Sequence, residues 1–412
     1  MLSSCASGGI LDDKNTHEIS EGQMDDLGIK NILAVSAAKP SGIAVDDGFI
    51  ADIADFSEKL FKAVCNPEAE ENTVLSPLSV IYALSLCANG ASGETLSEFE
   101  NVLGCESVSK MNEYLYTLTE SLGMTEKSTF DSANAVWANA DSFTLNDSFA
   151  DVAKRYYKVE AASLSFSDQK TLKIINDWVS KNTDGMIKDA LDELDPCVAV
   201  MLMNTVLFDG VWENEYSEND INKGIFTNRD DTKTECEYMY SKEYSYFETD
   251  GGVGFSKAYK DGYSFIAVLP DEGTDIRDFV SEIDLSDIIE KASEGGEEVQ
   301  VQIPKFEYDF KTDLRSVLTS LGLEKAFTSD AELGGLQAGG ENNLYISDIL
   351  QKAKIITNEH GTKAVAVTEI MVRMTSMIHD EPKRIYLDRP FFYAITNSDG
   401  VVLFVGTVET LN

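Results

Sequence analysis

Histidine is scarce in this chain, which restricts the chemistry that it can perform. The 412 residues include three histidines, His17, His360 and His379. A hydrolase with a histidine base would have to build its active site around one of these positions. The sequence also lacks the GxSxG, HExxH, Walker and EF-hand patterns that mark nucleophilic, metal and phosphate sites. We therefore expect no enzymatic activity, and we expect neither a metal nor a cofactor.

Positive charge is also in short supply. The chain has 33 Lys and Arg against 72 Asp and Glu, which gives a formal net charge of -39. Because basic side chains are too few to neutralise a run of phosphates, we do not expect nucleic acid as a partner. An anionic membrane surface would be repelled as well. The acidity favours a soluble, self-repelling surface, and a specific basic partner is the alternative.

Long apolar runs are missing. The apolar run at 79–88 covers about ten residues, whereas a membrane-spanning helix needs roughly 18. No other stretch of the sequence comes closer. We therefore expect no transmembrane segment.

Paired cysteines are missing too. The six cysteines form no CxxC pair and have no metal-ligand spacing. A chain of this length can build its own core, so we expect free and buried thiols rather than a disulfide framework.

The first 47 residues differ from the rest of the chain. They are rich in Asp, Ser, Gly and Lys and show little periodicity, which predicts a flexible acidic leader or tether over 1–47. Within it, Leu2-Ser3-Ser4-Cys5 resembles a bacterial lipobox and would place a lipid anchor on Cys5. The charged and apolar parts of a signal peptide are missing upstream, so a chance tetrapeptide is the alternative. We expect an extracellular protein, either secreted or held at the cell surface as a lipoprotein.

Beyond the leader, helical and extended patterns are interleaved. An amphipathic helix is predicted over 46–64, a buried helix over 78–88 after Ser76-Pro77, and a third helix over 171–180. Strands are predicted at 198–208, 263–270, 299–310, 385–396 and 401–408, with Pro304 at a bulge or edge and a hairpin at 397–400. Because the regular βαβ rhythm is absent, the pattern predicts an α+β domain.

The most informative stretch is 358–368. As a strand, it would carry small uncharged residues on one face: Thr362, Ala364, Ala366 and Thr368. The charged residues Lys363 and Glu369 would lie on the opposite face. Such a strand can enter the middle of a sheet without burying a charge.

This stretch resembles the hinge of the serpins. The matching residues are Glu359, Gly361, Thr362, Ala364, Ala366 and Thr368. The resemblance extends over about 49–412 through further segments in the family's order, at 75–79, 175–187, 203–212, 303–306, 388–393 and 403–406. It implies one serpin domain over 48–412, with three β-sheets, about nine helices and an exposed reactive-centre loop at about 359–384.

The resemblance also implies a function. A serpin of this kind is an irreversible suicide-substrate inhibitor of serine proteases, and it acts as a monomer that its target attacks. The protease forms an acyl-enzyme with the loop, and the cut loop then enters the main sheet as an added strand. A non-inhibitory serpin that serves as a binding or storage protein is the alternative, and the small residues Ala364 and Ala366 argue against it.

The scissile bond follows from the family's usual spacing. A count of about sixteen residues after the hinge glutamate places Thr375 before the cut and Ser376 after it. Thr375 suits a small, elastase-like primary pocket, and a subtilisin-like target is also expected. Cleavage after Met374 or Met377 would suit a roomier apolar pocket, and Arg373 would suit a trypsin-like one. We rank Thr375 first, Met374 second and Arg373 third.

Five further residues resemble the parts of the sheet that must open. Ser76, Ser79 and Asn204 resemble the family's shutter, a polar group under the centre of the sheet, although helix capping and a satisfied buried amide would also explain them. Trp212 resembles the tryptophan at the top of the sheet where the loop first enters, with a plain core aromatic as the alternative. Gln351 stands where many members have a shutter histidine. It can still donate and accept, but it cannot supply a pH-linked opening.

Overall fold

The computed structural model describes residues 33, 39–65, 71–122, 125–340, 344–347, 349–362 and 383–411. Within these ranges it contains nine α-helices, α2 (Asp47–Val64), α3 (Pro77–Ala88), α4 (Gly93–Val102), α5 (Val108–Leu122), α6 (Asp147–Tyr157), α7 (Gln169–Asn182), α8 (Ile276–Glu282), α9 (Leu285–Ser293) and α10 (Arg315–Ser320). The strands are β1 (Thr73–Leu75), β2 (Thr129–Asn139), β3 (Glu160–Leu164), β4 (Val200–Val211), β5 (Ile221–Thr227), β6 (Lys233–Thr249), β7 (Gly252–Ala258), β8 (Ser264–Pro270), β9 (Glu297–Pro304), β10 (Phe306–Asp313), β11 (Leu350–Asn358), β12 (Gly361–Thr362), β13 (Lys383–Tyr386), β14 (Phe391–Thr396) and β15 (Val402–Val408). The fold is therefore α+β.

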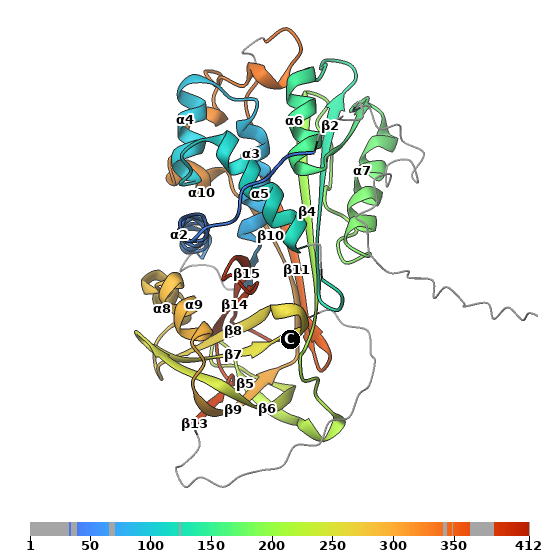
Figure 1. Ribbon diagram of the computed structural model, residues 1–412. Helices are drawn as coiled ribbons and strands as arrows, with labels where there is room; N and C mark the ends of the chain where they lie inside the picture. The colour runs from blue at the N-terminus through green and yellow to red at the C-terminus, as the bar shows by residue number, and fades with distance from the viewer. Residues whose placement is uncertain are drawn as a thin grey trace, which may run out of the picture.

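A six-stranded sheet runs along the length of the molecule. Its strand order is β10-β11-β12-β4-β2-β3, and β4 pairs antiparallel with almost the whole of β2. Helix α3 packs on one face of this sheet and α7 on the other, as Figure 1 shows. This double covering is the reason for the nearly unbroken apolar sequence of β4.

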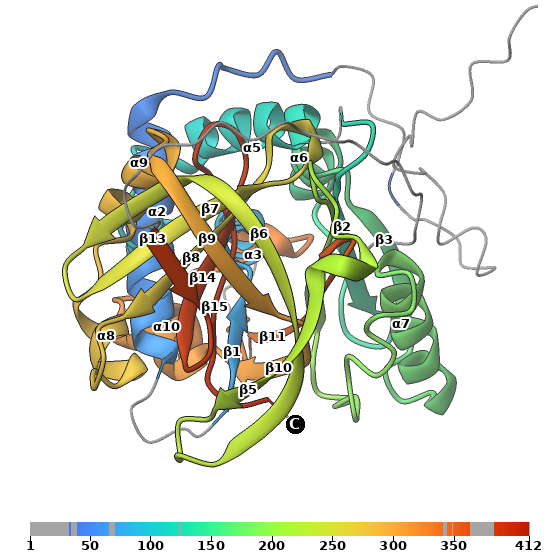
Figure 2. The same ribbon diagram turned by 90° about the horizontal axis from the view of Figure 1, so that it is seen from below.

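The remaining strands form one continuous hydrogen-bonded sheet of nine strands. Strand β6 belongs to both of its halves, because it pairs with β7 near its C-terminal end and with β5 and β9 along the rest of its length. The expected second and third sheets are thus joined through β6. Figure 2 views this curved sheet from below.

The predicted helix starts are confirmed. Asp46 caps α2, where its side chain accepts a hydrogen bond from the N–H of Phe49. Ser76 caps α3, and Pro77 occupies the first turn, where its missing N–H has no cost. The third predicted helix is α7, and it is two residues longer at each end.

Two strand predictions were wrong in the same way. The predicted strand 299–310 is two strands, β9 in the nine-stranded sheet and β10 in the six-stranded sheet, which separate at Lys305 after Pro304. The predicted strand 385–396 is likewise β13 and β14, with Pro390 between them. In each case proline, which lacks a backbone donor, lies where the chain leaves one ladder and joins another.

The cysteine prediction is partly corrected. The five described cysteines are free, and Cys65 and Cys87 are buried as expected. Cys197 is exposed, however, and two others are half-buried. Among the described helices, none is both long enough and apolar enough to cross a membrane.

Candidate functional site: the opening in the six-stranded sheet

The six-stranded sheet is bridged at one point by a very short strand. β12 pairs with β11 on one side, where Thr362 faces Thr357, and with β4 on the other, where Thr362 faces Gly210. Both pairings are antiparallel, so β11 and β4 run in the same direction. Among the described residues, no strand lies between β11 and β4 beyond Thr362.

A pocket lies in this opening. The pocket is small, and Phe208 from β4, Ile355 from β11 and Thr362 are among the residues that line it. Phe208 and Ile355 are buried, so the pocket reaches the core side of the sheet. An incoming strand would therefore meet buried apolar side chains on the core side of the opening.

The turn between β11 and β12 is held by the segment that follows β4. The N–H of Trp212 donates to the carbonyl of His360 over 2.9 Å, and the N–H of Tyr216 donates to the carbonyl of Glu359 over 3.0 Å. Inside the turn, the N–H of His360 donates to Asn358 Oδ1. We call 358–362 the hinge and 212–216 the hinge support.

Gly361 brings two backbones unusually close. A Cβ at this position would lie 1.8 Å from the carbonyl oxygen of Gly210, well inside the contact distance of any real side chain. The backbone φ of Gly361 is 156°. Only glycine permits the hinge to pair with β4 in this way.

Thr362 points into the core. It is buried, and its hydroxyl shares hydrogen bonds with the hydroxyls of Tyr259 at 2.6 Å and Thr357 at 3.4 Å. At Thr362, the strand face that was predicted to carry the small residues therefore lies on the buried side of the sheet.

Trp212 joins the two sides of the opening. Its indole N–H donates to the carbonyl of Asn358 over 2.9 Å, and its ring stacks on Tyr259 with centroids 4.2 Å apart. It is fully buried, yet it contacts the hinge directly. Its role at the entry of the loop stays a prediction of the family resemblance.

Charged groups surround the hinge. Glu359 pairs with Lys305 at 2.8 Å, and His360 Nδ1 lies 3.0 Å from the carboxylate of Glu215. Burial is the largest single influence and acts to raise the pKa of Glu359, but the hydrogen bond from Lys305, a backbone hydrogen bond and the nearby positive charge together outweigh it and the pKa is lowered. Burial acts to lower the pKa of Lys305, but its bonds to Glu359 and Glu237 leave that pKa raised. Both groups are therefore charged near neutrality.

Further along the opening, polar side chains gather under β4. The hydroxyl of Ser79 donates to Asn204 Oδ1, and Asn204 Nδ2 donates to Ser132 Oγ at 3.1 Å and Asn134 Oδ1 at 2.8 Å. Asn134 in turn donates to the carbonyl of Tyr157. The cluster links α3, β4, β2 and α6.

Gln351 and Ser76 form a second polar contact across from this cluster. Gln351 Nε2 donates to the carbonyl of Ser76 over 2.8 Å, while the side chain of Ser76 accepts from the N–H of Ser79. Gln351 Oε1 is buried and has no hydrogen-bond partner within the described part of the chain. Thr357 on β11 and Gly210 on β4 both face Thr362. Gln351 and Asn204 lie six residues earlier on these two parallel strands, so they face each other across the opening.

Sequence analysis missed several residues of this site. Ser132, Asn134 and Tyr259 are central to it, and the polar pair Ser132 and Asn134 on an otherwise apolar face of β2 was a signal available in the sequence. Lys305 was noted only as part of a matching segment. The remaining predicted residues lie outside the described residues: Cys5, Ala364, Ala366, Thr368, Arg373, Met374, Thr375, Ser376 and Met377.

Comparison with known proteins identifies the family. The model of the family described as serpin (serine protease inhibitor) matches residues 51–411. The chain belongs to the serpin family. Many members of this family are serine protease inhibitors rather than enzymes, and they interact with target proteases.

Individual relatives support the assignment. This serpin is 28% identical to neuroserpin of Homo sapiens over 386 residues, which cover 87% of this chain and 92% of neuroserpin. It is similar to the crystal structure of the thermophilic serpin tengpin in the native state, with a TM-score of 0.86, 35% identity, and coverage of 93% of this chain and 100% of tengpin. For tengpin in the latent state, the TM-score is 0.80 at 35% identity, with 90% of this chain and 100% of tengpin covered.

Proposed function

We propose that this serpin is an irreversible suicide-substrate inhibitor of serine proteases, with elastase-like or subtilisin-like enzymes as its targets. The observation that carries the proposal is the opening between β11 and β4, in which the two residues of β12 already occupy the first positions of a missing strand. Cleavage of the loop would free the chain after Thr362 to continue that strand.

The pairing register supports this step. If β12 continues antiparallel to both neighbours, Ala364 arrives between Phe208 and Ile355, which are among the residues that line the pocket. Alternate residues share a face, so Ala364 and Ala366 would follow Thr362 onto the core side. Small side chains fit there without displacing the buried residues of β4 and β11.

The same register brings Thr368 between Asn204 and Gln351. Its hydroxyl would meet the buried Gln351 Oε1, which lacks a partner among the described residues. A buried acceptor without a donor costs about 1–3 kcal/mol, and the inserted strand would remove this cost. The shutter role of Ser76, Ser79, Asn204 and Gln351 is part of the proposal.

The free energies are large enough for the mechanism. About 12 to 15 inserted residues, each contributing about 0.5–1.5 kcal/mol of net hydrogen bonding together with side-chain burial, give on the order of 10–20 kcal/mol. A protease domain is stable by roughly 5–15 kcal/mol. Insertion can therefore distort the captured enzyme before the acyl bond is hydrolysed.

We further propose how the chain is organised and where it acts. Residues 48–412, together with Asp46 and Asp47 at the start of α2, form one inhibitory domain that acts as a monomer. The earlier part of the 1–47 leader forms a tether that a lipid on Cys5 holds at the cell surface, or that is secreted with the domain. The target attacks the bond between Thr375 and Ser376, with Met374, Arg373 and Met377 as the alternative registers.

The proposal is tested by incubation with elastase, subtilisin and trypsin in separate reactions. We expect a complex that resists SDS with at least one of them, and mass spectrometry of the released peptide then identifies the scissile bond. Clean cleavage by all three without a complex would contradict inhibition of these enzyme classes and would favour the non-inhibitory alternative.

A further inference from the structure

Lys257, on β7, is a lysine inside the protein. It is 2% exposed, although the chain carries a strong excess of acidic residues over basic ones. A buried ammonium without partners is very unfavourable, so its contacts must compensate for the lost hydration.

Those contacts come from three directions. Lys257 Nζ donates to Glu243 Oε1 on β6 over 3.0 Å and to the carbonyl of Asn214 over 3.2 Å. It also lies 4.5 Å from the ring centre of Tyr216 and 5.4 Å from that of Trp212, within the range of cation–π attraction. Burial acts to lower the pKa of Lys257, but Tyr216 and Glu243 outweigh it and the pKa is raised. The group is therefore an ammonium.

Three of the four partners belong to the hinge support. Trp212, Asn214 and Tyr216 face the ammonium from one short segment, and the N–H groups of Trp212 and Tyr216 are the donors that hold the hinge carbonyls. The next amide, that of Glu213, donates to the carbonyl of Ala258, the residue after Lys257. The segment is thus fixed to β7 by its backbone and by one charge.

We propose that Lys257 is a positioning residue of the hinge: its ammonium holds residues 212–216 in place so that they can keep the hinge closed on β4. The proposal rests on the proposed function, in which loop insertion starts at this hinge. Removing the charge loosens the hinge support and lets the hinge open more often before any cleavage.

Hydrogen exchange in the uncleaved protein, followed by mass spectrometry, tests this role. Lys257→Met keeps the apolar stem of the side chain and removes the charge. We expect the amides of Trp212 and Tyr216 to exchange about tenfold faster in the variant, because local opening sets their exchange. Amides of β14 and β15 should exchange at the wild-type rate.

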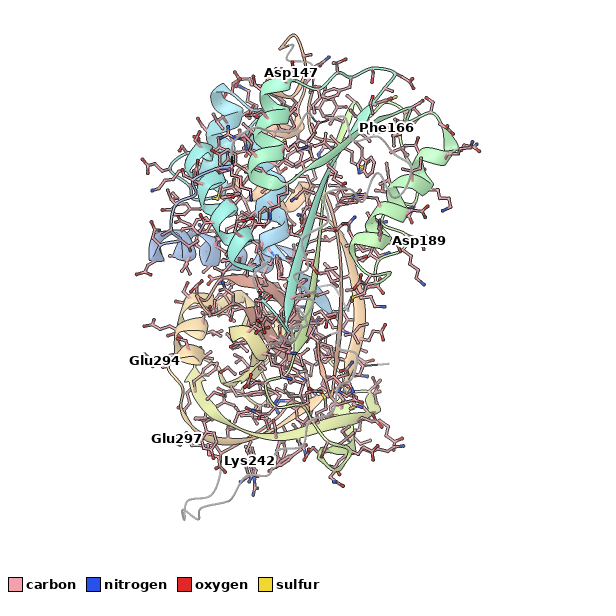
Figure 3. The ribbon with its side chains drawn as sticks, turned by 45° about the vertical axis from the view of Figure 1, so that its right-hand side comes forward. Asp147, Phe166, Asp189, Lys242, Glu294 and Glu297 are labelled. Atoms are coloured by element: carbon pink, nitrogen blue, oxygen red, sulfur yellow. The ribbon has the colours of Figure 1, made fainter. Side chains whose placement is uncertain are left out.

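Lys242→Met is the matched control. Lys242 is on the same strand as Glu243, but it is 46% exposed and pairs with Glu298, and Figure 3 shows it near Glu297 at the outer end of the sheet. We expect wild-type exchange at Trp212 and Tyr216 in this variant. Acceleration equal to that in Lys257→Met would overturn the proposal.

A double variant separates positioning from the effect of leaving Glu243 without its cation. In Lys257→Met with Glu243→Gln, the orphaned carboxylate is gone, but the contacts to Asn214, Trp212 and Tyr216 are still missing. We expect the fast exchange to persist. Its return to the wild-type rate, unchanged exchange in Lys257→Met, or uniform acceleration throughout the chain would each contradict the positioning role.

Two further variants serve as additional controls. Lys257→Arg retains a cation and should restore slow exchange at the two amides. If Lys257→Met does not fold, Glu243→Gln weakens the same contacts and should accelerate the same two amides, and no local acceleration would overturn the proposal. Since no protease is used, a failure to trap proteases would contradict the proposed function without affecting this result.

Discussion

Gly361 is a single residue on which the contact between hinge and sheet depends. A Cβ there would overlap the carbonyl oxygen of Gly210, and neither backbone can move without breaking the pairing of β12 with β4. The requirement for glycine at this position is therefore steric, and it belongs to the uncleaved state.

We predict that Gly361→Ala destabilises the uncleaved protein by about 3 kcal/mol, as measured by urea unfolding. Gly185→Ala is a suitable control, because Gly185 has a positive φ of 76° but no atom within 4 Å of the added Cβ. That control should lose only about 1–2 kcal/mol from backbone strain. If both variants lose the same free energy of unfolding, the close approach of Gly361 to β4 does not contribute to the cost of the substitution.

The ion pair of Glu359 and Lys305 gives the hinge a defined pH dependence. The lowered pKa of Glu359 means that its contribution is present above its ordinary pKa, near 4.5, and is lost as pH falls through the folded value. The raised pKa of Lys305 means that its contribution is present below about 10.5 and is lost as pH rises through the folded value.

We therefore predict that Glu359→Gln lowers the free energy of unfolding by up to about 1 kcal/mol at pH 7. Urea unfolding of both proteins at several pH values should show this difference shrinking as pH falls below about 4.5. A difference that stays constant down to pH 3 would contradict the assignment of the pair.

At the scale of elements, the proposed insertion requires one particular face of the loop strand to point into the core. Ala364 would arrive on the core side between Phe208 and Ile355, whereas its neighbour Val365 would face outward. These two adjacent positions therefore provide a paired test of the strand's orientation.

We predict that Ala364→Arg is cleaved by the target protease at the normal rate but forms no SDS-resistant complex. Burying its guanidinium between two apolar side chains would cost several kcal/mol. Val365→Arg carries the same charge one residue later and should trap the protease as the wild type does. Trapping by both variants, or by neither, would contradict the predicted register.

The sequence predicted elements best where a local pattern decides them. The helix starts near Asp46 and after Ser76 and the turn at 397–400 depend on neighbouring residues, and the structure confirms them. The break at Lys305 was missed, because two strands of alternating apolar and polar residues that are separated by one residue read as one strand until their partners are known. Tertiary pairing, which puts β9 and β10 in different sheets, overrides the local pattern.

In the candidate site too, a sequence pattern identifies some residues and only the tertiary packing identifies others. The residues that match the hinge and shutter of the family could be named from the sequence, and the structure brings Ser79 to Asn204 and Trp212 to the hinge. Lys257 and Tyr259 carried no signal, since a lysine and a tyrosine near the end of a strand normally indicate the surface. Their importance comes from the packing of β7 against the hinge support.

At the scale of the whole molecule, the central claim is that the uncleaved protein is not in its most stable arrangement. An added strand would complete three features: the opening in the six-stranded sheet, the pocket beside Thr362, and Gln351 Oε1, which has no partner among the described residues. Strand insertion requires no change in the strand pairing of the nine-stranded sheet or in the helices.

The most direct test is the unfolding temperature before and after a single cut in the loop, with the cut confirmed by mass spectrometry. If the loop enters between β4 and β11, we predict that cleavage raises the unfolding temperature by at least about 15 °C, and that Ala364→Arg loses this increase. An unfolding temperature that stays the same or falls on cleavage would contradict strand insertion.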